Sequence, residues 1–148
     1  MNTVIQDSTT TSNKSKASPS KRLSVGLWTN QILLAVMFGM AGFMKATQPI
    51  SQLSAMLPFV AQMPEGLVRF IGASELAGAV GLILPAALRI VPVLTPLAAS
   101  GLVVVMVLAA GFHISRGEFS NVPVNFILGS LAAFVAWGRL KMVPISKR

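Results

Sequence analysis

Glu75 is the residue of this sequence whose type and position most strongly indicate chemistry. It lies inside the apolar stretch of residues 69–85, RFIGASELAGAVGLILP, which is typical of a membrane-spanning helix. At 100° per residue, Gly72, Gly78 and Ala79 fall within about 60° of Glu75 on the helix surface. A carboxylate at this depth costs about 2.5–3.5 kcal/mol on insertion scales, so it is expected to face protein rather than lipid. Glu75 is therefore the first candidate for a functional site.

Four further polar side chains are expected near Glu75, because each lies at or near one end of an apolar stretch: Lys45, Arg69, His113 and Asn125. If four helices cross the membrane in alternating directions, all of these groups lie in the half of the bundle away from the chain termini, which we call the outer half. Lys45, His113 and Asn125 each lie at one end of a row of mostly small residues on one helix face. Small residues let membrane helices approach closely. The residues expected to pack the helices together are Gly39, Gly42, Gly72, Gly78, Ala79 and Gly129.

These groups predict a polar pocket in the outer half that binds a quinone headgroup or another small polar molecule. A quinone needs an apolar slot, hydrogen-bond donors for its carbonyl oxygens and a nearby group that exchanges protons. Lys45, Arg69 or His113 would supply the donors, and Glu75 would exchange protons. Because Arg69 projects about 120° away from Glu75 around the helix, Lys45 and His113 are the expected partners of the carboxylate.

Each of these residues also has a purely structural interpretation, and the sequence leaves both open. Lys45 and Arg69 could extend to the membrane interface, as basic residues at span ends commonly do. His113 could lie at the level of the lipid headgroups, and the role of Asn125 could be only to hold helices together. Glu75 could form an ion pair that sets the helix register without any further role.

The composition identifies the class of protein and excludes several kinds of chemistry. Hydrophobic residues make up 53% of the 148 residues, charged residues only 11%, and the mean hydropathy is +0.72, which together indicate an integral membrane protein. There is no cysteine, which excludes disulfides, thiolate catalysis and thiolate metal ligands. A single histidine cannot supply both axial ligands of a bis-histidine haem. We therefore expect no catalytic residues, no metal site and no enzymatic activity of the chain on its own.

The net charge of +8 does not indicate nucleic-acid binding, because the basic residues lie at the termini and helix ends rather than on one soluble face. They are expected to contact lipid headgroups and to set the topology. Nine of the 12 lysines and arginines lie in the terminal segments and the second loop. Basic residues favour the cytoplasmic side, so both termini are predicted to be cytoplasmic in a bacterial inner membrane.

The predicted fold is all-α, an integral membrane antiparallel four-helix bundle. A disordered basic cytoplasmic tail is expected over residues 1–22 and a transmembrane domain over residues 23–148, with spans at about 25–44, 67–84, 93–114 and 124–140. Pro85 is expected to close the second span. The segment of residues 46–66 predicts a short interfacial helix or a structured loop. A secretory signal is the alternative to the first span, but the apolar run is long for a signal and lacks a convincing cleavage site.

Two segments resemble a known family. FGMAGFMKATQP at the end of the first span and RFIGASELAGAVGLILP in the second, with the four-span layout, resemble the DoxX family, and more closely its DoxX-like branch of small bacterial membrane proteins. The resemblance covers about residues 31–140. It implies a four-helix membrane protein whose recurrent lysine and glutamate match Lys45 and Glu75. Relatives include a quinone-reducing thiosulfate oxidoreductase subunit and components of membrane oxidoreductase complexes. Because this chain has no cysteine, the thiosulfate-oxidising activity is not carried over to it.

Three functions are consistent with the sequence. The first is an accessory subunit of a membrane redox system with an outer pocket for a quinone or another small molecule. The second is a small proton-coupled transporter that uses Glu75, which the positive charges of Lys45 and Arg69 disfavour for a cationic substrate. The third is a structural scaffold for a membrane partner. The expected partners are the lipid bilayer and either a membrane oxidoreductase subunit or a second copy of the chain.

Overall fold

Four long helices make up most of the protein and confirm the predicted all-α membrane bundle. The structure is a computed structural model that describes residues 19–147. In this range the long helices are α1 (Pro19–Thr47), α3 (Glu65–Leu88), α4 (Leu94–Ser115) and α5 (Val122–Trp137). The first three, and the helical stretch Phe119–Met142 that contains α5, are long and apolar enough to cross a membrane. The last helix continues as η3 (Gly138–Met142), and the connections contain the short helices α2 (Ile50–Met56), η1 (Pro58–Gln62) and η2 (Phe119–Asn121).

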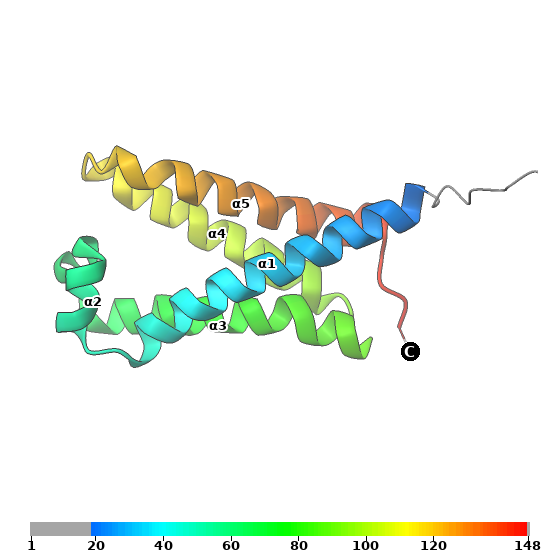
Figure 1. Ribbon diagram of the computed structural model, residues 1–148, viewed down its shortest axis with the longest axis horizontal. Coiled ribbons are helices and arrows are strands. Elements are labelled where there is room, and N and C mark those ends of the chain that lie inside the picture. The colour runs from blue at the N-terminus through cyan, green and yellow to red at the C-terminus, as the bar shows by residue number, and fades with distance from the viewer. Residues whose placement is uncertain (1–18, 148) are drawn as a thin grey trace, which may run out of the picture.

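The long helices pack as two pairs, α1 with α3 and α4 with α5, and α3 joins the pairs by packing on α4. In Figure 1, α1 crosses α4, and the two pairs diverge toward the end that carries α2. We call this the outer end, and the opposite end, where α1 begins and η3 lies, the inner end. Buried apolar side chains fill the space between the pairs, among them Leu34, Phe38, Leu82, Leu102 and Val135. Large apolar side chains also cover the outside of the bundle, as a lipid environment requires.

α1 begins earlier than the apolar pattern predicts. Lys21 and Arg22 are helical, so the prediction of a disordered tail to residue 22 is wrong for residues 19–22. Both side chains favour helix, and a helix can continue past its apolar run into the headgroup region. The 29 residues of α1 extend about 43 Å, more than the roughly 30 Å hydrocarbon core. The rest of the predicted tail lies outside the described residues.

Pro85 does not close α3, which is a second correction to the predicted span. The helix continues through Pro85 to Leu88 and ends where Arg89 adopts a left-handed conformation with φ of 57°. A proline inside a membrane helix is tolerated where a neighbouring side chain satisfies the disturbed backbone. Here the side chain of Gln31 in α1 donates a hydrogen bond of 2.7 Å to the carbonyl of Leu82, next to the position that the proline disrupts.

The segment between α1 and α3 folds back over the outer end. Leu53 of α2 and Val60 of η1 are fully buried and pack with Val68 of α3. This small apolar cluster fixes α2 and η1 against the outer end of the bundle.

Candidate functional site

Two glycines bring α1 and α3 into backbone contact and so position the candidate site. A Cβ atom on Gly42 would lie 2.7 Å from the carbonyl oxygen of Gly72, and a Cβ atom on Gly72 would lie 2.8 Å from the Cβ of Lys45. No larger side chain fits at either position without separating the helices. Both glycines therefore occupy the crossing point of the two helices.

The glycine crossing places Lys45 directly against Glu75. Lys45 Nζ donates hydrogen bonds to both carboxylate oxygens of Glu75, each at 2.7 Å. Both side chains are buried, with exposed fractions of 12% for Lys45 and 4% for Glu75. A buried charge is tolerated only when it is paired and hydrogen-bonded, so each residue permits the burial of the other.

Arg69 binds the end of α1 rather than the carboxylate of Glu75. Its Nη1 atom donates to the backbone carbonyls of Lys45 at 2.8 Å and Gln48 at 2.7 Å, and its Nη2 atom donates to Glu65 at 3.0 Å. These carbonyls lack partners within the helix, so Arg69 caps α1. Arg69 therefore fixes the backbone that carries Lys45.

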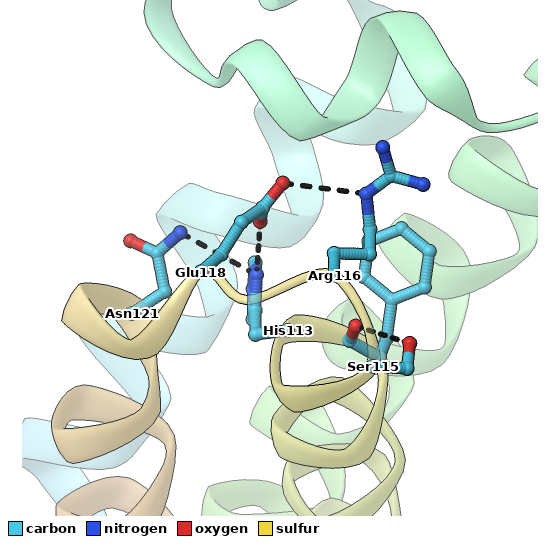
Figure 2. A network of polar contacts seen from close by, with 6 residues as sticks. His113, Ser115, Arg116, Glu118 and Asn121 are labelled. Atoms are coloured by element: carbon cyan, nitrogen blue, oxygen red, sulfur yellow. Dashed lines mark hydrogen bonds and ion pairs between the residues drawn. The ribbon is translucent and has the colours of Figure 1, made fainter.

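His113 was predicted to pair with Glu75, but the structure does not place it beside that carboxylate. Its Nδ1 atom lies 2.7 Å from Oε2 of Glu118 and 3.4 Å from Nδ2 of Asn121, as Figure 2 shows. The ring of Phe59, from η1, meets the imidazole edge to face at 5.1 Å. Since Glu118 lies in the loop five residues after His113, it reaches the ring more readily than a residue on another span does. The expected pairing of His113 with Glu75 is thus wrong.

Glu118 is fixed by His113 and Arg116 and lies outside the membrane-spanning segments. Besides His113, Nε of Arg116 lies 3.4 Å from Oε1 of Glu118. The hydrogen bond from His113 is the main reason that the pKa of Glu118 is below the ordinary value of 4.5, and partial burial opposes this effect. A carboxylate that stays ionised accepts a hydrogen bond from Nδ1–H, which favours the His113 tautomer with hydrogen on Nδ1.

A cavity of about 540 Å³ lies between the two helix pairs in the outer half. Its walls are mostly apolar, and α1, η1, α3, α4 and α5 all contribute to them. Six polar side chains line it: Lys45, Ser74, Glu75, His113, Asn121 and Asn125. Two of its apolar lining residues, Phe70 of α3 and Leu108 of α4, are more than two-thirds exposed on the outside of the bundle. The cavity therefore reaches the lipid-facing surface between these helices.

Asn125 lines this cavity and has an unused hydrogen-bond donor. The residue is 8% exposed, and its Nδ2 atom is buried without a hydrogen-bond partner. Buried amide groups are almost always hydrogen-bonded, so an unpaired one in a cavity wall indicates a site for a group that accepts a hydrogen bond. Of the predicted site residues, Lys45, Glu75, His113 and Asn125 line the cavity, and Arg69 does not.

The other residues predicted to pack helices also lie at close contacts. A Cβ atom on Gly78 would lie 2.5 Å from Leu102 of α4, and one on Gly129 would lie 3.2 Å from Met106. Gly39 faces the Cβ of Ala79 at 3.8 Å. These residues lie where neighbouring helices meet. Within residues 19–147, no three histidine, aspartate or glutamate side chains are grouped so that they could hold a metal ion.

Comparison with known families gives a result that agrees with this architecture. The model of the DoxX-like family matches residues 29–135, well over half of the chain. The chain belongs to the DoxX-like family. The match begins inside α1 and ends inside α5, so it includes α3, α4, parts of α1 and α5, and every residue that lines the outer cavity. No curated protein and no solved structure matches the chain.

The sequence reasoning missed two groups of polar residues in this DoxX-like protein. Glu118 and Asn121 escaped notice because a loop has no regular period that places its side chains relative to a helix. At the inner end, Gln31 and Arg139 form a buried hydrogen bond of 2.7 Å between α1 and η3. The signal for that pair was present, since Gln31 is a polar residue within the apolar run of the first span.

Proposed function

We propose that this DoxX-like protein is a non-catalytic membrane subunit that binds a lipid-soluble small molecule, a quinone in the first instance, in the outer cavity. The observation that carries the proposal is the buried and unpaired Nδ2 atom of Asn125 in a mostly apolar cavity wall. A quinone carbonyl accepts hydrogen bonds and donates none, which matches an amide donor without a partner.

The shape and access of the cavity support the same class of ligand. A volume of about 540 Å³ lies within the usual range for small-molecule sites. The apolar residues Phe70 and Leu108 lie both in its lining and on the lipid-facing surface, so a ligand dissolved in the bilayer can enter from the side. A ligand with an apolar tail could keep the tail among lipid chains while its polar head reaches Asn125.

Lys45 and Glu75 complete the polar end of the proposed site. Nζ of Lys45 uses two hydrogen-bond directions on Glu75 and has a third proton to donate. Glu75 and His113, both in the lining, are groups that can exchange protons with a ligand. The pair also counts against the transporter alternative, because a cation would have to displace Lys45 from both carboxylate oxygens of Glu75.

Direct binding of a soluble quinone tests the proposal. We expect 2-methyl-1,4-naphthoquinone to bind the purified protein in nanodiscs in equilibrium dialysis, and Asn125→Leu to weaken binding about tenfold, since one buried hydrogen bond is lost. Asn30→Leu is the matched control, because Nδ2 of Asn30 already donates to the carbonyl of Leu131 outside the cavity. Equal affinity of Asn125→Leu and the wild-type protein would refute this site.

The scaffold alternative has one observation in its favour, the contact of α1 with α3 at Gly42 and Gly72 beside the Lys45–Glu75 pair. In this alternative the pair only sets the helix register, and the protein presents its surface to a membrane oxidoreductase subunit or to a second copy. A Lys45→Ala, Glu75→Ala double variant that assembles normally and still binds the quinone would show that the pair has no part in the binding site.

The proposed setting is the bacterial inner membrane with both termini in the cytoplasm. The inner end carries most of the basic residues, which favours its placement on the cytoplasmic side. The outer cavity would then lie on the periplasmic side of the bilayer. Labelling of a single introduced cysteine at residue 2 or at residue 118 by a membrane-impermeant maleimide in intact spheroplasts tests this orientation, and only the latter is expected to react.

A further inference from the structure

Arg139 is a buried charge at the inner end without a carboxylate partner among residues 19–147. The residue lies in η3 with only 4% of its surface exposed. Its Nε atom donates to Oε1 of Gln31 at 2.7 Å, and its guanidinium lies 5.4 Å from the centre of the Trp28 ring. Its Nη2 atom is buried without a hydrogen-bond partner.

The carboxylates in the described part of the chain are all engaged at the outer half. Glu65 pairs with Arg69, Glu75 with Lys45, and Glu118 with His113. Among residues 19–147, the charge of Arg139 is therefore balanced only by an amide oxygen and the face of an aromatic ring. A buried cation of this kind normally requires an anion.

The guanidinium is held in place by three helices and is not free to extend into water. A Cβ atom on Gly138 would lie 2.6 Å from Leu27, so η3 packs closely on the start of α1. Gln31, which accepts from Arg139, is fully buried and is fixed in turn by its hydrogen bond to the carbonyl of Leu82 in α3. The fold thus fixes a positive group at the depth of Trp28, near the end of a span, where lipid headgroups lie.

We propose that Arg139 is the recognition residue of a binding site for the phosphodiester of an anionic phospholipid at the inner end. Guanidinium donors suit phosphate oxygens, and a net negative headgroup supplies the charge that the described chain lacks. Lys21, Arg22 and Lys141 add positive charge at the same end of the bundle. This site lies at the opposite end of the bundle from the outer cavity and does not depend on the function proposed for that cavity.

Fluorescence quenching by brominated lipids tests this site, because Trp28 lies beside the guanidinium. In a Trp137→Phe background Trp28 is the sole tryptophan. In vesicles with equal mole fractions, we expect brominated phosphatidylglycerol to be enriched about fivefold over brominated phosphatidylcholine near Trp28, as quenching reports. Arg139→Gln should abolish the preference, and the control Arg89→Gln, at the same end of the bundle, should retain it. A preference that survives Arg139→Gln would overturn the proposal.

Three further measurements test the proposal if Arg139→Gln does not fold. Gln31→Glu places a carboxylate beside Arg139, so it should remove the lipid preference while retaining the arginine. Inorganic phosphate added to the vesicles should leave the preference unchanged, and its loss would assign the site to a free anion. Asp7 is the one acidic side chain of the sequence outside residues 19–147, and Asp7→Asn should also leave the preference unchanged. A preference seen only in Asp7→Asn would show that the chain itself supplies the anion and would overturn the proposal.

Discussion

At the scale of single residues, an ion pair joins Lys45 and Glu75, which are 30 positions apart in the sequence. Either charge alone would be costly at its depth in the membrane. The pair is tolerated because Lys45 Nζ satisfies both carboxylate oxygens of Glu75 at 2.7 Å. Its stability depends on both partners being present.

Removal of one partner should therefore destabilise the protein more than removal of both. We expect Lys45→Met to lower the free energy of unfolding by about 3–5 kcal/mol, because Glu75 is left as an unpaired buried charge. The measurement is thermal or denaturant unfolding of the purified protein in detergent micelles.

The matched control for Lys45→Met is the double variant Lys45→Met, Glu75→Gln. It removes both charges and should recover most of the lost stability, since no unpaired ion remains. A single variant as stable as the wild-type protein, or a double variant no better than the single one, would contradict the role of the pair.

Glu118 makes stability depend on pH in a predictable direction. Its pKa is lower in the folded protein than the ordinary value of 4.5, so the unfolded chain binds a proton more readily. The stabilising contribution is fully present above pH 4.5 and is lost as the pH falls below 4.5 through the folded pKa. We expect the difference in melting temperature between the wild-type protein and Glu118→Gln to shrink in acid, and a constant difference across this range would disprove the interaction.

The sequence allowed some contacts of the site to be predicted but not others. Lys45 and Glu75 could be matched because both lie on helices whose faces follow from a period of 3.6 residues. The pairing of His113 could not, because its partner Glu118 lies in the loop after α4 and no periodicity applies there. The unpaired amide of Asn125 depends on the packing of several helices and becomes visible only in the folded structure.

At the scale of helices, the crossing of α1 and α3 decides whether the site forms. We expect Gly42→Ala to lower the free energy of unfolding by about 1–3 kcal/mol, because the new Cβ atom would lie 2.7 Å from the backbone oxygen of Gly72. The variant should also weaken quinone binding, since the separation of the helices displaces Lys45. Both effects can be measured on the same preparation.

Gly101→Ala is the matched control for the crossing. No atom lies within 4 Å of a Cβ atom at Gly101, and alanine favours helix more than glycine does. This variant should be as stable as the wild-type protein or slightly more so. If Gly42→Ala behaved in the same way, close packing at the crossing would not determine stability.

The positions of the helices could be predicted from apolar runs, but their ends could not. α1 starts earlier than its apolar run because helix-favouring lysine and arginine extend it. α3 continues past Pro85, and Gln31, from another helix, donates to the carbonyl of Leu82, which is adjacent to the carbonyl of Gly81 that the proline leaves without a donor. Both differences arise from interactions that hydropathy does not describe.

At the scale of the whole molecule, polar side chains are buried at two depths that an apolar core separates. The outer group lines a cavity that reaches the lipid-facing surface, and the inner group is a fixed guanidinium near the headgroups. Between them lie Leu34, Phe38, Leu82 and Leu102, which hold the two helix pairs together. We infer that the outer group binds a lipid-soluble ligand and that the inner group binds the membrane itself.

The most direct test of the outer cavity is the identification of what the protein carries out of its native membrane. The wild-type protein and the variant Ala109→Trp would be extracted gently into nanodiscs, and the quinone bound to each would be quantified by mass spectrometry. The new tryptophan fills the cavity from its wall on α4. We predict about one quinone per wild-type chain above the level set by the lipids, as expected for a single site, and none for Ala109→Trp. Equal amounts of quinone in the two preparations would contradict the proposed function.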